Sequence, residues 1–270
     1  MVWPMSSPKS DMRLYIDLLF RKTNMYANYN PTTLLELGDY GDITKEGEFI
    51  RSGNILQEDT SLRDAVESGK EPTGSDKYYF ASRSPRNNTF SVITTDIPTL
   101  AECSPKVGWD IKKDRHAALI MINANRHEIR FEGRLHRYIQ NLPELAEKAV
   151  VTKVYRCSAY AQLITNDGQS GQVYAGFKGN NSAPSTPNSS GTSVVERAWQ
   201  TFSQTGNWNT GTHPLSSSLY TPLVTIRQIR PKGPTTGYRD PIPPEITDED
   251  EMQDYILPWG DLDEHGDEID

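Results

Sequence analysis

The sequence feature that most constrains this fold is an uninterrupted strand pattern over residues 149–164. Because side chains alternate between the two faces of a strand, even positions from Val150 to Ile164 form one face and odd positions from Val151 to Leu163 the other. A typical strand has about 5–6 residues. A strand of about 15 residues reaches roughly 50 Å, beyond the roughly 30 Å apolar core of a bilayer. The pattern predicts either a bent strand in an ordinary sheet or one arm of a membrane hairpin.

The neighbouring segments extend this pattern. An Asn-Asp-Gly turn at residues 166–168 follows the long strand, and residues 172–178 are predicted to return as its partner. Residues 117–122 (AALIMI) form the most apolar run of the chain. Cations lie on both sides of that run, at Lys106, Lys112, Lys113 and Arg115 before it and at Arg126, Arg130, Arg134 and Arg137 after it.

Shorter patterns predict the other elements. The apolar spacing of residues 11–22, with Asp11 as cap, favours a helix that packs on a sheet or lies on a lipid surface through Arg13, Arg21 and Lys22. Residues 219–229 predict an edge strand because they contain a proline. The remaining predictions are a hairpin over 38–56, strands over 77–80 and 89–97, helices over 58–68 and 193–202, helix or loop over 131–148, and loops over 180–192 and 206–214.

Composition excludes several classes of protein. The 270 residues contain no apolar run near 18 residues and no secretory signal, so we expect no transmembrane helix and a cytoplasmic chain. Cys103 and Cys157 are predicted to be free thiols, and neither has a spaced partner for a metal site. The spacing of His116, His127 and His136 predicts surface histidines. Nucleotide-binding, hydrolase and metalloprotease motifs are absent, which predicts a protein without enzymatic activity, metal or cofactor.

The formal net charge of −8 conceals an uneven distribution. Residues 240–270 hold 13 of the 36 acidic residues and none of the 28 Lys and Arg residues, so residues 1–239 carry a net charge of +5. Such a tail either keeps the chain soluble or neutralises a basic surface that anionic lipid or nucleic acid would otherwise attract. Within it, residues 255–259 (YILPW) form an apolar cluster that can dock on the body.

Three phrases of the sequence, in this order, carry a resemblance to a known family. They are GDITKEGEFIRSGNI (residues 41–55), WDIKKDRHAALIMI (109–122) and LPELAEKAVVTKVYRCSAYAQLIT (142–165). Together they resemble the pore-forming domain of the gasdermins, especially the small fungal members. The resemblance covers roughly residues 35–180 and is a match of strand order and short phrases.

The resemblance implies an α+β fold, with a twisted, mostly antiparallel sheet and peripheral helices. It implies a pore-forming domain at 1–230, and a Pro-rich linker with an acidic tail at 231–270. Gasdermin-like proteins bind acidic phospholipids, oligomerise and insert β-hairpins to permeabilise the plasma membrane. The fungal ones act in programmed cell death, innate immunity and allorecognition (heterokaryon incompatibility). Expected partners are acidic lipids, the chain itself or an allelic variant, and a protease acting near residues 231–244, but not nucleic acid.

Mapped onto this chain, the family's first membrane hairpin corresponds to about residues 77–122 and its second to about residues 149–178. The implied lipid contacts are Arg13, Arg21, Lys22, Lys112, Lys113, Arg115, Arg126, Arg130, Arg134 and Arg137. The implied hairpin residues are Ala117, Ala118, Leu119, Ile120, Val150, Val151, Val154, Tyr155, Tyr160, Leu163, Val173 and Phe177.

The chain departs from the larger gasdermins in two ways, and other functions stay open. It has only some 40 residues after Ile229 in place of a large repressor domain, and no N-terminal cysteine for lipidation. A soluble interaction protein of the same fold is the first alternative. A nucleic-acid-binding protein is the second, although acids alternate with the cations and no RNA-binding signature occurs. An enzyme whose catalytic residues are distant in sequence is the third.

Overall fold

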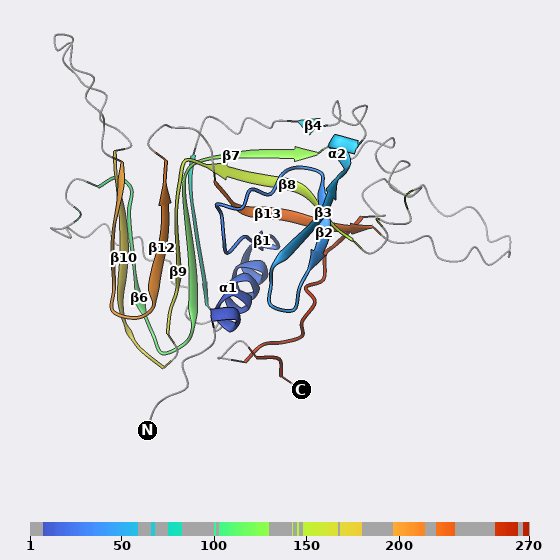
Figure 1. The fold of residues 1–270 in the computed structure, drawn as a ribbon. Coiled ribbons are helices and arrows are strands. Elements are labelled where there is room, and N and C mark those ends of the chain that lie inside the picture. Colours follow the sequence, from blue (N-terminus) through green and yellow to red (C-terminus); the bar gives the residue numbers. More distant parts are fainter. Residues whose placement is uncertain are drawn as a thin grey trace, which may run out of the picture. The chain divides into compact units, whose positions relative to one another are not determined.

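The chain folds into two compact units in a computed structural model. Unit 1 comprises residues 1–73, 125–156 and 221–270, and unit 2 comprises residues 74–124 and 157–220. The described residues are 8–58, 66–67, 75–82, 100, 103–129, 142, 145, 148–166, 168–179, 197–213, 220–229, 252–263 and 267–269. Few of them are helical and most strands pair antiparallel, which confirms the predicted α+β class (Figure 1).

The elements follow one another along the chain in this order. They are α1 (Pro8–Thr23), β1 (Tyr26–Ala27), β2 (Asp39–Ile43), β3 (Phe49–Asn54), α2 (Ile55–Glu58), β4 (Val66–Glu67), β5 (Ser75–Ser82), β6 (Lys106–Ile111), β7 (His116–Ile129), β8 (Ala149–Cys157), β9 (Ala159–Ile164), β10 (Gly171–Lys178), β11 (Ala198–Ser203), β12 (Asn207–Thr212), β13 (Tyr220–Ile229) and β14 (Met252–Asp254).

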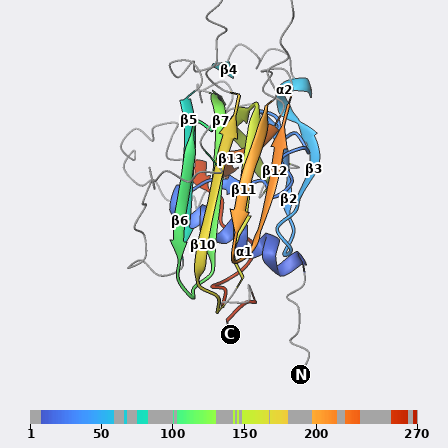
Figure 2. The same cartoon turned by 90° about the vertical axis from the view of Figure 1, so that its left-hand side faces the viewer.

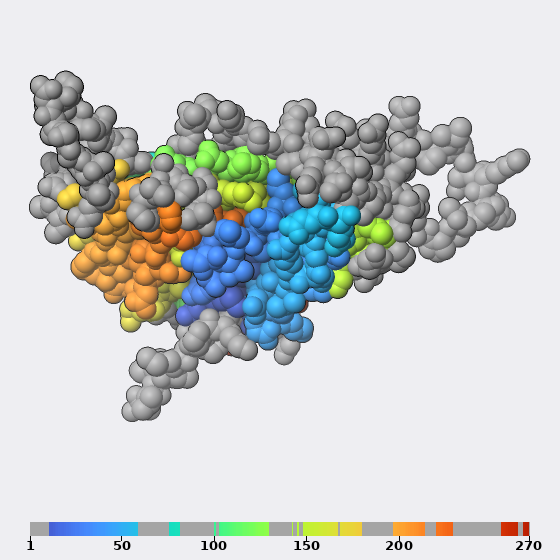
Figure 3. All heavy atoms as spheres, turned by 45° about the horizontal axis from the view of Figure 1, so that its top comes forward, coloured from blue at the N-terminus to red at the C-terminus, as the bar shows by residue number. Residues whose placement is uncertain are grey.

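Unit 1 combines α1 with an antiparallel sheet. Its strands pair as β1 with β13, β13 with β8, and β8 with the C-terminal part of β7. The predicted hairpin over 38–56 is confirmed as β2 and β3, and β2 also pairs with β8. This hairpin turns at Gly47, whose φ of 98° lies in the left-handed region that favours glycine. Its strands lie at the surface, blue to light blue in Figure 3.

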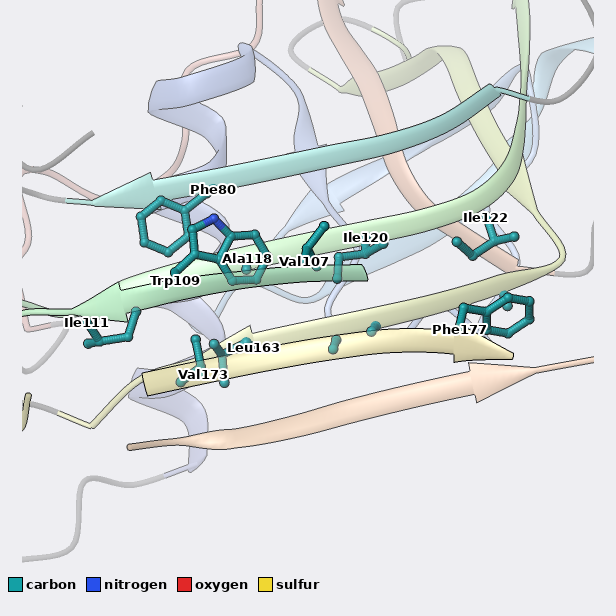
Figure 4. Packing of buried hydrophobic residues seen from close by; sticks show 13 residues of the cluster. Phe80, Val107, Trp109, Ile111, Ala118, Ile120, Ile122, Leu163, Val173 and Phe177 are labelled. Atoms are coloured by element: carbon teal, nitrogen blue, oxygen red, sulfur yellow. The ribbon is translucent and has the colours of Figure 1, made fainter. Parts of the chain in front are cut away.

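Unit 2 consists of two packed sheets. One has the order β5-β7-β9-β12, and the other has the order β6-β10-β11 (Figure 2). Both contribute side chains to one apolar cluster between them, among them Phe80, Trp109, Ile120, Val173 and Phe177 (Figure 4). Stacked sheets bury one face of each strand in this way, so the central strands carry almost continuous apolar sequence.

The long strand pattern at residues 149–164 corresponds to two strands. The chain bends at Ser158, which separates β8 from β9, so the strand is bent in this structure, and the membrane hairpin stays a prediction. The predicted pairing with residues 172–178 is wrong. Those residues form β10, but β10 pairs with β6 and β11, whereas β9 pairs with β7 and β12. The Asn-Asp-Gly turn leads from one sheet of unit 2 into the other, because the apolar residues of β10 are buried against β9 rather than beside it.

Three further predictions of local structure are wrong. Within the helix predicted over 58–68, residues 66–67 form β4, which pairs with β7, and residues 59–65 and 68 lie outside the described residues. The predicted helix over 193–202 and loop over 206–214 contain β11 and β12, since pairing with β10 and β9 outweighs weak local preference. The strand predicted at 219–229 is confirmed as β13, but it lies between β1 and β8 rather than at an edge.

Several predictions fall outside the described residues. These are the strand at 89–97, most of the helix or loop segments at 131–148, the loop at 180–192, the protease-sensitive segment at 231–244, and the residues Arg130, Arg134, Arg137 and His136. Among the described residues, none of the helices has the length and apolar character needed to span a membrane.

Candidate functional site on helix α1

Helix α1 carries a wide apolar face and a cationic end. The predicted helix is confirmed, but it begins at Pro8, so Asp11 lies within the first turn rather than at the cap. Arg21 and Lys22 lie in the last turn, where a positive charge interacts favourably with the helix dipole. Leu14, Tyr15, Ile16, Leu18 and Leu19 are buried, which fixes this face of the helix within unit 1.

A buried carboxylate interrupts the apolar face of α1. Asp17 accepts a hydrogen bond from Arg21 Nε at 2.8 Å and another from Trp259 Nε1 at 3.4 Å. Burial raises the pKa of Asp17, while the charge and hydrogen bond of Arg21 oppose that rise. The carboxylate is therefore the point at which α1 meets a residue that lies 242 positions away in sequence.

Trp259 anchors the C-terminal segment, by which we mean residues 255–263 and 267–269. The indole is 8% exposed, and its neighbour Leu262 is fully buried. The ring reaches the turn of the β2–β3 hairpin, where a Cβ atom at Gly47 would lie 3.6 Å from Trp259 Cη2. The predicted docking of the apolar cluster is thus confirmed for Trp259, whereas Ile256 is 78% exposed.

The same segment brings three carboxylates to the cations of α1. It folds back on itself, because Ile269 N donates to Asp261 O at 2.8 Å and Asp263 N donates to Asp267 O at 2.8 Å. The resulting ion pairs join Arg13 to Asp267 at 3.4 Å, Arg13 to Glu268 at 3.5 Å and Arg21 to Asp261 at 2.8 Å. The negative charge of the C-terminal residues was evident from the sequence. No sequence pattern, however, marked Asp17, Asp261, Asp267 or Glu268 as contact residues.

Magnitudes indicate which contact holds the segment. Exposed ion pairs contribute about 0.2–1 kcal/mol each, and Asp261 and Asp267 are largely exposed. Burial of a Trp side chain is worth several times more, at about 25 cal/mol per Å² of apolar area. Apolar burial, that of Trp259 together with Leu262, therefore provides most of the docking energy.

The other predicted lipid-binding cations do not all share an exposed environment. Lys112 and Lys113 are exposed in the turn between β6 and β7 of unit 2. Arg115, by contrast, is 4% exposed, so its side chain is covered by protein in this structure, and its contact with lipid stays a prediction. Arg126 is partly buried on β7 and lies 3.7 Å from Glu128.

The predicted membrane-hairpin residues are all buried in this structure. They are Ala117, Ala118, Leu119 and Ile120 on β7; Val150, Val151, Val154 and Tyr155 on β8; Tyr160 and Leu163 on β9; and Val173 and Phe177 on β10. Neighbouring residues such as Val150 and Val151 point to opposite faces of a strand, so both faces of these strands are covered by protein.

A groove of about 300 Å³ opens beside β7 and β8 in unit 1. Its lining includes Glu36, Gln57, His127 and Arg156. These groups contact one another, since Arg156 lies 3.7 Å from Glu36 and Gln57 Nε2 donates to Glu36 at 3.4 Å. Burial and the charge of Arg156 lower the pKa of His127.

The prediction of surface histidines is wrong for His116, which is 2% exposed.

Comparison with known proteins identifies no family. No family model matches the chain, and a search of curated proteins finds no match. Among the residues that the structure describes, no three His, Cys, Asp or Glu side chains are grouped so that they could hold a metal ion. The covered cationic surface of α1 is therefore the best-defined candidate site.

Proposed function

We propose that this chain is a gasdermin-like, membrane pore-forming protein whose C-terminal segment restrains it until a trigger releases that segment. The observation that carries the proposal is the docking of Trp259 and three carboxylates on α1. Arg13 and Arg21 already bind carboxylates in this state. Anionic lipid headgroups would offer them the same chemistry, so the segment and a membrane compete for one surface.

The cations of α1 set the strength of the proposed attraction to an anionic membrane. A basic residue near an anionic membrane contributes about 1 kcal/mol. Arg13, Arg21 and Lys22 on α1 would together provide about 3 kcal/mol. Lys112 and Lys113, in the β6–β7 turn of unit 2, are further proposed lipid contacts. Release of the C-terminal segment removes its carboxylates from Arg13 and Arg21 and uncovers the apolar surface beneath Trp259. Acidic phospholipids are accordingly the proposed ligand.

The apolar strands are the proposed membrane-inserting elements. The family resemblance assigns β5, β6 and β7 to the first hairpin, over about residues 77–122, and β8, β9 and β10 to the second, over about residues 149–178. Within a membrane, every backbone amide must be paired, which antiparallel hairpins achieve when they associate with further copies. Insertion requires these strands to leave their present packing, and such a loss of core contacts requires a trigger. We propose that the trigger is proteolysis near residues 231–244 or contact with an allelic variant, and that assembly occurs at the plasma membrane.

Dye release from vesicles tests this proposal. Three proteins are compared: the full chain, the full chain with Trp259→Ala, and a chain that ends at Arg239. Each is added to vesicles that contain phosphatidylserine and to vesicles of phosphatidylcholine alone. We expect the two altered proteins to release dye from the anionic vesicles at least tenfold faster than the full chain, and to leave the neutral vesicles intact.

The matched control is Ile256→Ala, which removes an exposed apolar side chain from the same segment. It should behave as the unaltered chain does. If neither altered protein releases dye, even when mixed with an allelic variant, the pore-forming proposal is wrong and a soluble interaction protein becomes the better account.

A further inference from the structure

β7 pairs with β9 on one side of a kink and with β8 on the other, and the two ladders share one register. β7 pairs with β9 from Ala117 opposite Ile164 to Ile122 opposite Ala159. Its pairing with β8 then runs from Asn125 opposite Arg156 onward. Only two residue pairs are missing between these ladders, and no residue is inserted in either strand. A β-bulge would shift the register by one residue, so this interruption is a kink within an otherwise continuous antiparallel pair.

Backbone groups at the kink are bonded to other parts of unit 2. Asn123 has a φ of 52°, in the left-handed region, and its N–H donates to Asp76 Oδ1 at 3.1 Å. On the opposite strand, Ser158 N donates to Ile122 O at 3.2 Å, and Ser158 O accepts from His213 N at 3.1 Å. The two residues are thereby held away from the regular ladder.

Arg197 connects these groups from the residue that precedes β11. One terminal nitrogen donates to Ser158 Oγ at 2.8 Å, and the other donates to His213 O at 3.2 Å. The guanidinium also lies over the Phe177 ring, 5.5 Å from its centroid. A planar fork can hold two acceptors in a fixed geometry, which an ammonium group cannot do. Arg197 therefore fixes Ser158 and His213 relative to each other.

We propose that Arg197 is a positioning residue that latches the kink, and that its release lets the two missing residue pairs between β7 and the β8–β9 segment close. Because the register is already common to both ladders, closing these two pairs requires no slippage of one strand past the other. It requires only that Asn123 and Ser158 rotate.

A continuous ladder along β7 would be long enough to cross the apolar core of a bilayer. From Ala117 to Glu128, β7 would extend over about 40 Å at about 3.4 Å per residue. That length exceeds the roughly 30 Å apolar core of a bilayer, whereas neither ladder does so alone. The relevance to membranes rests on the proposed function, but the latch itself is a property of the fold.

The chain contains its own reporter for the kink. Cys157 belongs to one of the two missing pairs and is completely buried, and burial raises the pKa of its thiol, so it is unreactive in the latched state. Cys103 is a second buried thiol of unit 2, and its Sγ lies 3.3 Å from Gln200 Oε1. Labelling of both thiols under native conditions, quantified by mass spectrometry, distinguishes opening of the kink from general loosening.

The test compares the full chain with Arg197→Met, Arg197→Lys and Ser158→Ala. We expect Arg197→Met to accelerate labelling of Cys157 at least tenfold and to leave Cys103 unchanged. Lysine can contact one acceptor but not both, so Arg197→Lys should give an intermediate rate, as should Ser158→Ala. Thr201→Met, an exposed change on β11, serves as the matched control and should have no effect.

Two results would overturn the latch. One is an unchanged labelling rate of Cys157 in Arg197→Met, and the other is an equal acceleration at Cys157 and Cys103, which would reduce Arg197 to a general stabiliser. Dye release from phosphatidylserine vesicles then separates the two proposals. With Trp259→Ala present, Arg197→Met should release dye faster. If no variant releases dye, the proposed function fails, while the Cys157 measurement still decides whether the latch exists.

Discussion

The C-terminal segment of unit 1 and the sandwich of unit 2 are stabilised by different means. The segment is held by one buried indole, one buried leucine and ion pairs whose carboxylates are largely exposed. The sandwich is held by a cluster of thirteen buried apolar side chains, with Phe80 stacked on Trp109 at 5.2 Å. The first contact involves two buried apolar side chains, those of Trp259 and Leu262. The packing of the sandwich cannot be lost in one sheet alone, because a single cluster contains side chains of both sheets.

Under the proposed function, this difference gives the two regions separate roles. A contact that depends mainly on Trp259 can be broken by a protease, a partner or a lipid surface at a cost of a few kcal/mol. The apolar strands of unit 2 require a larger rearrangement, which we expect to begin at the latched kink. Four predictions test that contrast, beginning with the largest expected effect.

Substitution of Trp109 by alanine should remove the largest fully buried side chain of the sandwich. We expect the free energy of unfolding to fall by about 3–5 kcal/mol, because the site loses both burial and packing. Urea denaturation followed by tryptophan fluorescence and circular dichroism measures this. Phe202→Ala, at a 39% exposed ring that stacks on Tyr174, should cost at most about 1.5 kcal/mol. Equal costs at the two positions would contradict the proposed core.

Trp259→Ala should release the C-terminal segment without unfolding the body. The expected loss of docking free energy is about 2–4 kcal/mol, which corresponds to the burial of one indole. Hydrogen exchange of the amides of Leu262 and Ile269 should accelerate, while exchange in β7 and β9 should not change. An exchange rate at Ile269 equal to that of the unaltered chain would show that charge, not the indole, holds the segment.

Acid should destabilise the sandwich through His116. Burial lowers the pKa of this imidazole, and the charge of Asp114 only partly opposes that effect. A group whose pKa is lower in the folded state binds protons preferentially when unfolded. Its stabilisation is therefore complete above the unfolded pKa of about 6.5 and is lost as the pH falls, by up to about 1.4 kcal/mol per pH unit. In His116→Phe, which keeps the stacking on Phe80, this part of the pH dependence should disappear.

The ion pairs of α1 should contribute least. A double-mutant cycle with Arg13→Gln and Asp267→Asn should give a coupling energy below about 1 kcal/mol, and salt at about 0.5 M should abolish it. The measured quantity is the protection of the C-terminal segment from hydrogen exchange. A coupling energy comparable to the effect of Trp259→Ala would mean that the ion pairs, rather than the indole, dominate the docking.

The sequence predicted elements where the periodicity was strong. Helix α1 and the hairpin of β2 and β3 were expected because their apolar spacing and turn residues are unambiguous. β11 and β12 were missed, since Ser193 and the following valines imitate a helix start, and Gly206 with Asn209 imitates a loop. Their strand character arises from pairing with β10 and β9, which local sequence does not encode.

The candidate site was only partly predictable. Trp259 stood out because an apolar cluster within an acidic tail requires a partner. Its contact with Asp17 joins residues 242 positions apart, and no sequence pattern links them. The role of Arg197 was hidden for a similar reason, because Ser158 and His213 come together only when β9 and β12 pair.

Conductance across a planar lipid bilayer tests the central claim most directly, because it distinguishes discrete pores from general lysis. Full chains with and without Trp259→Ala are added to one side of a phosphatidylserine-containing bilayer. We predict stepwise, long-lived conductance increases for Trp259→Ala, rare events for the unaltered chain, and none when Arg13, Arg21 and Lys22 are also replaced by glutamine. A silent bilayer with every variant, or rupture without discrete steps, would contradict the claim that this chain forms pores.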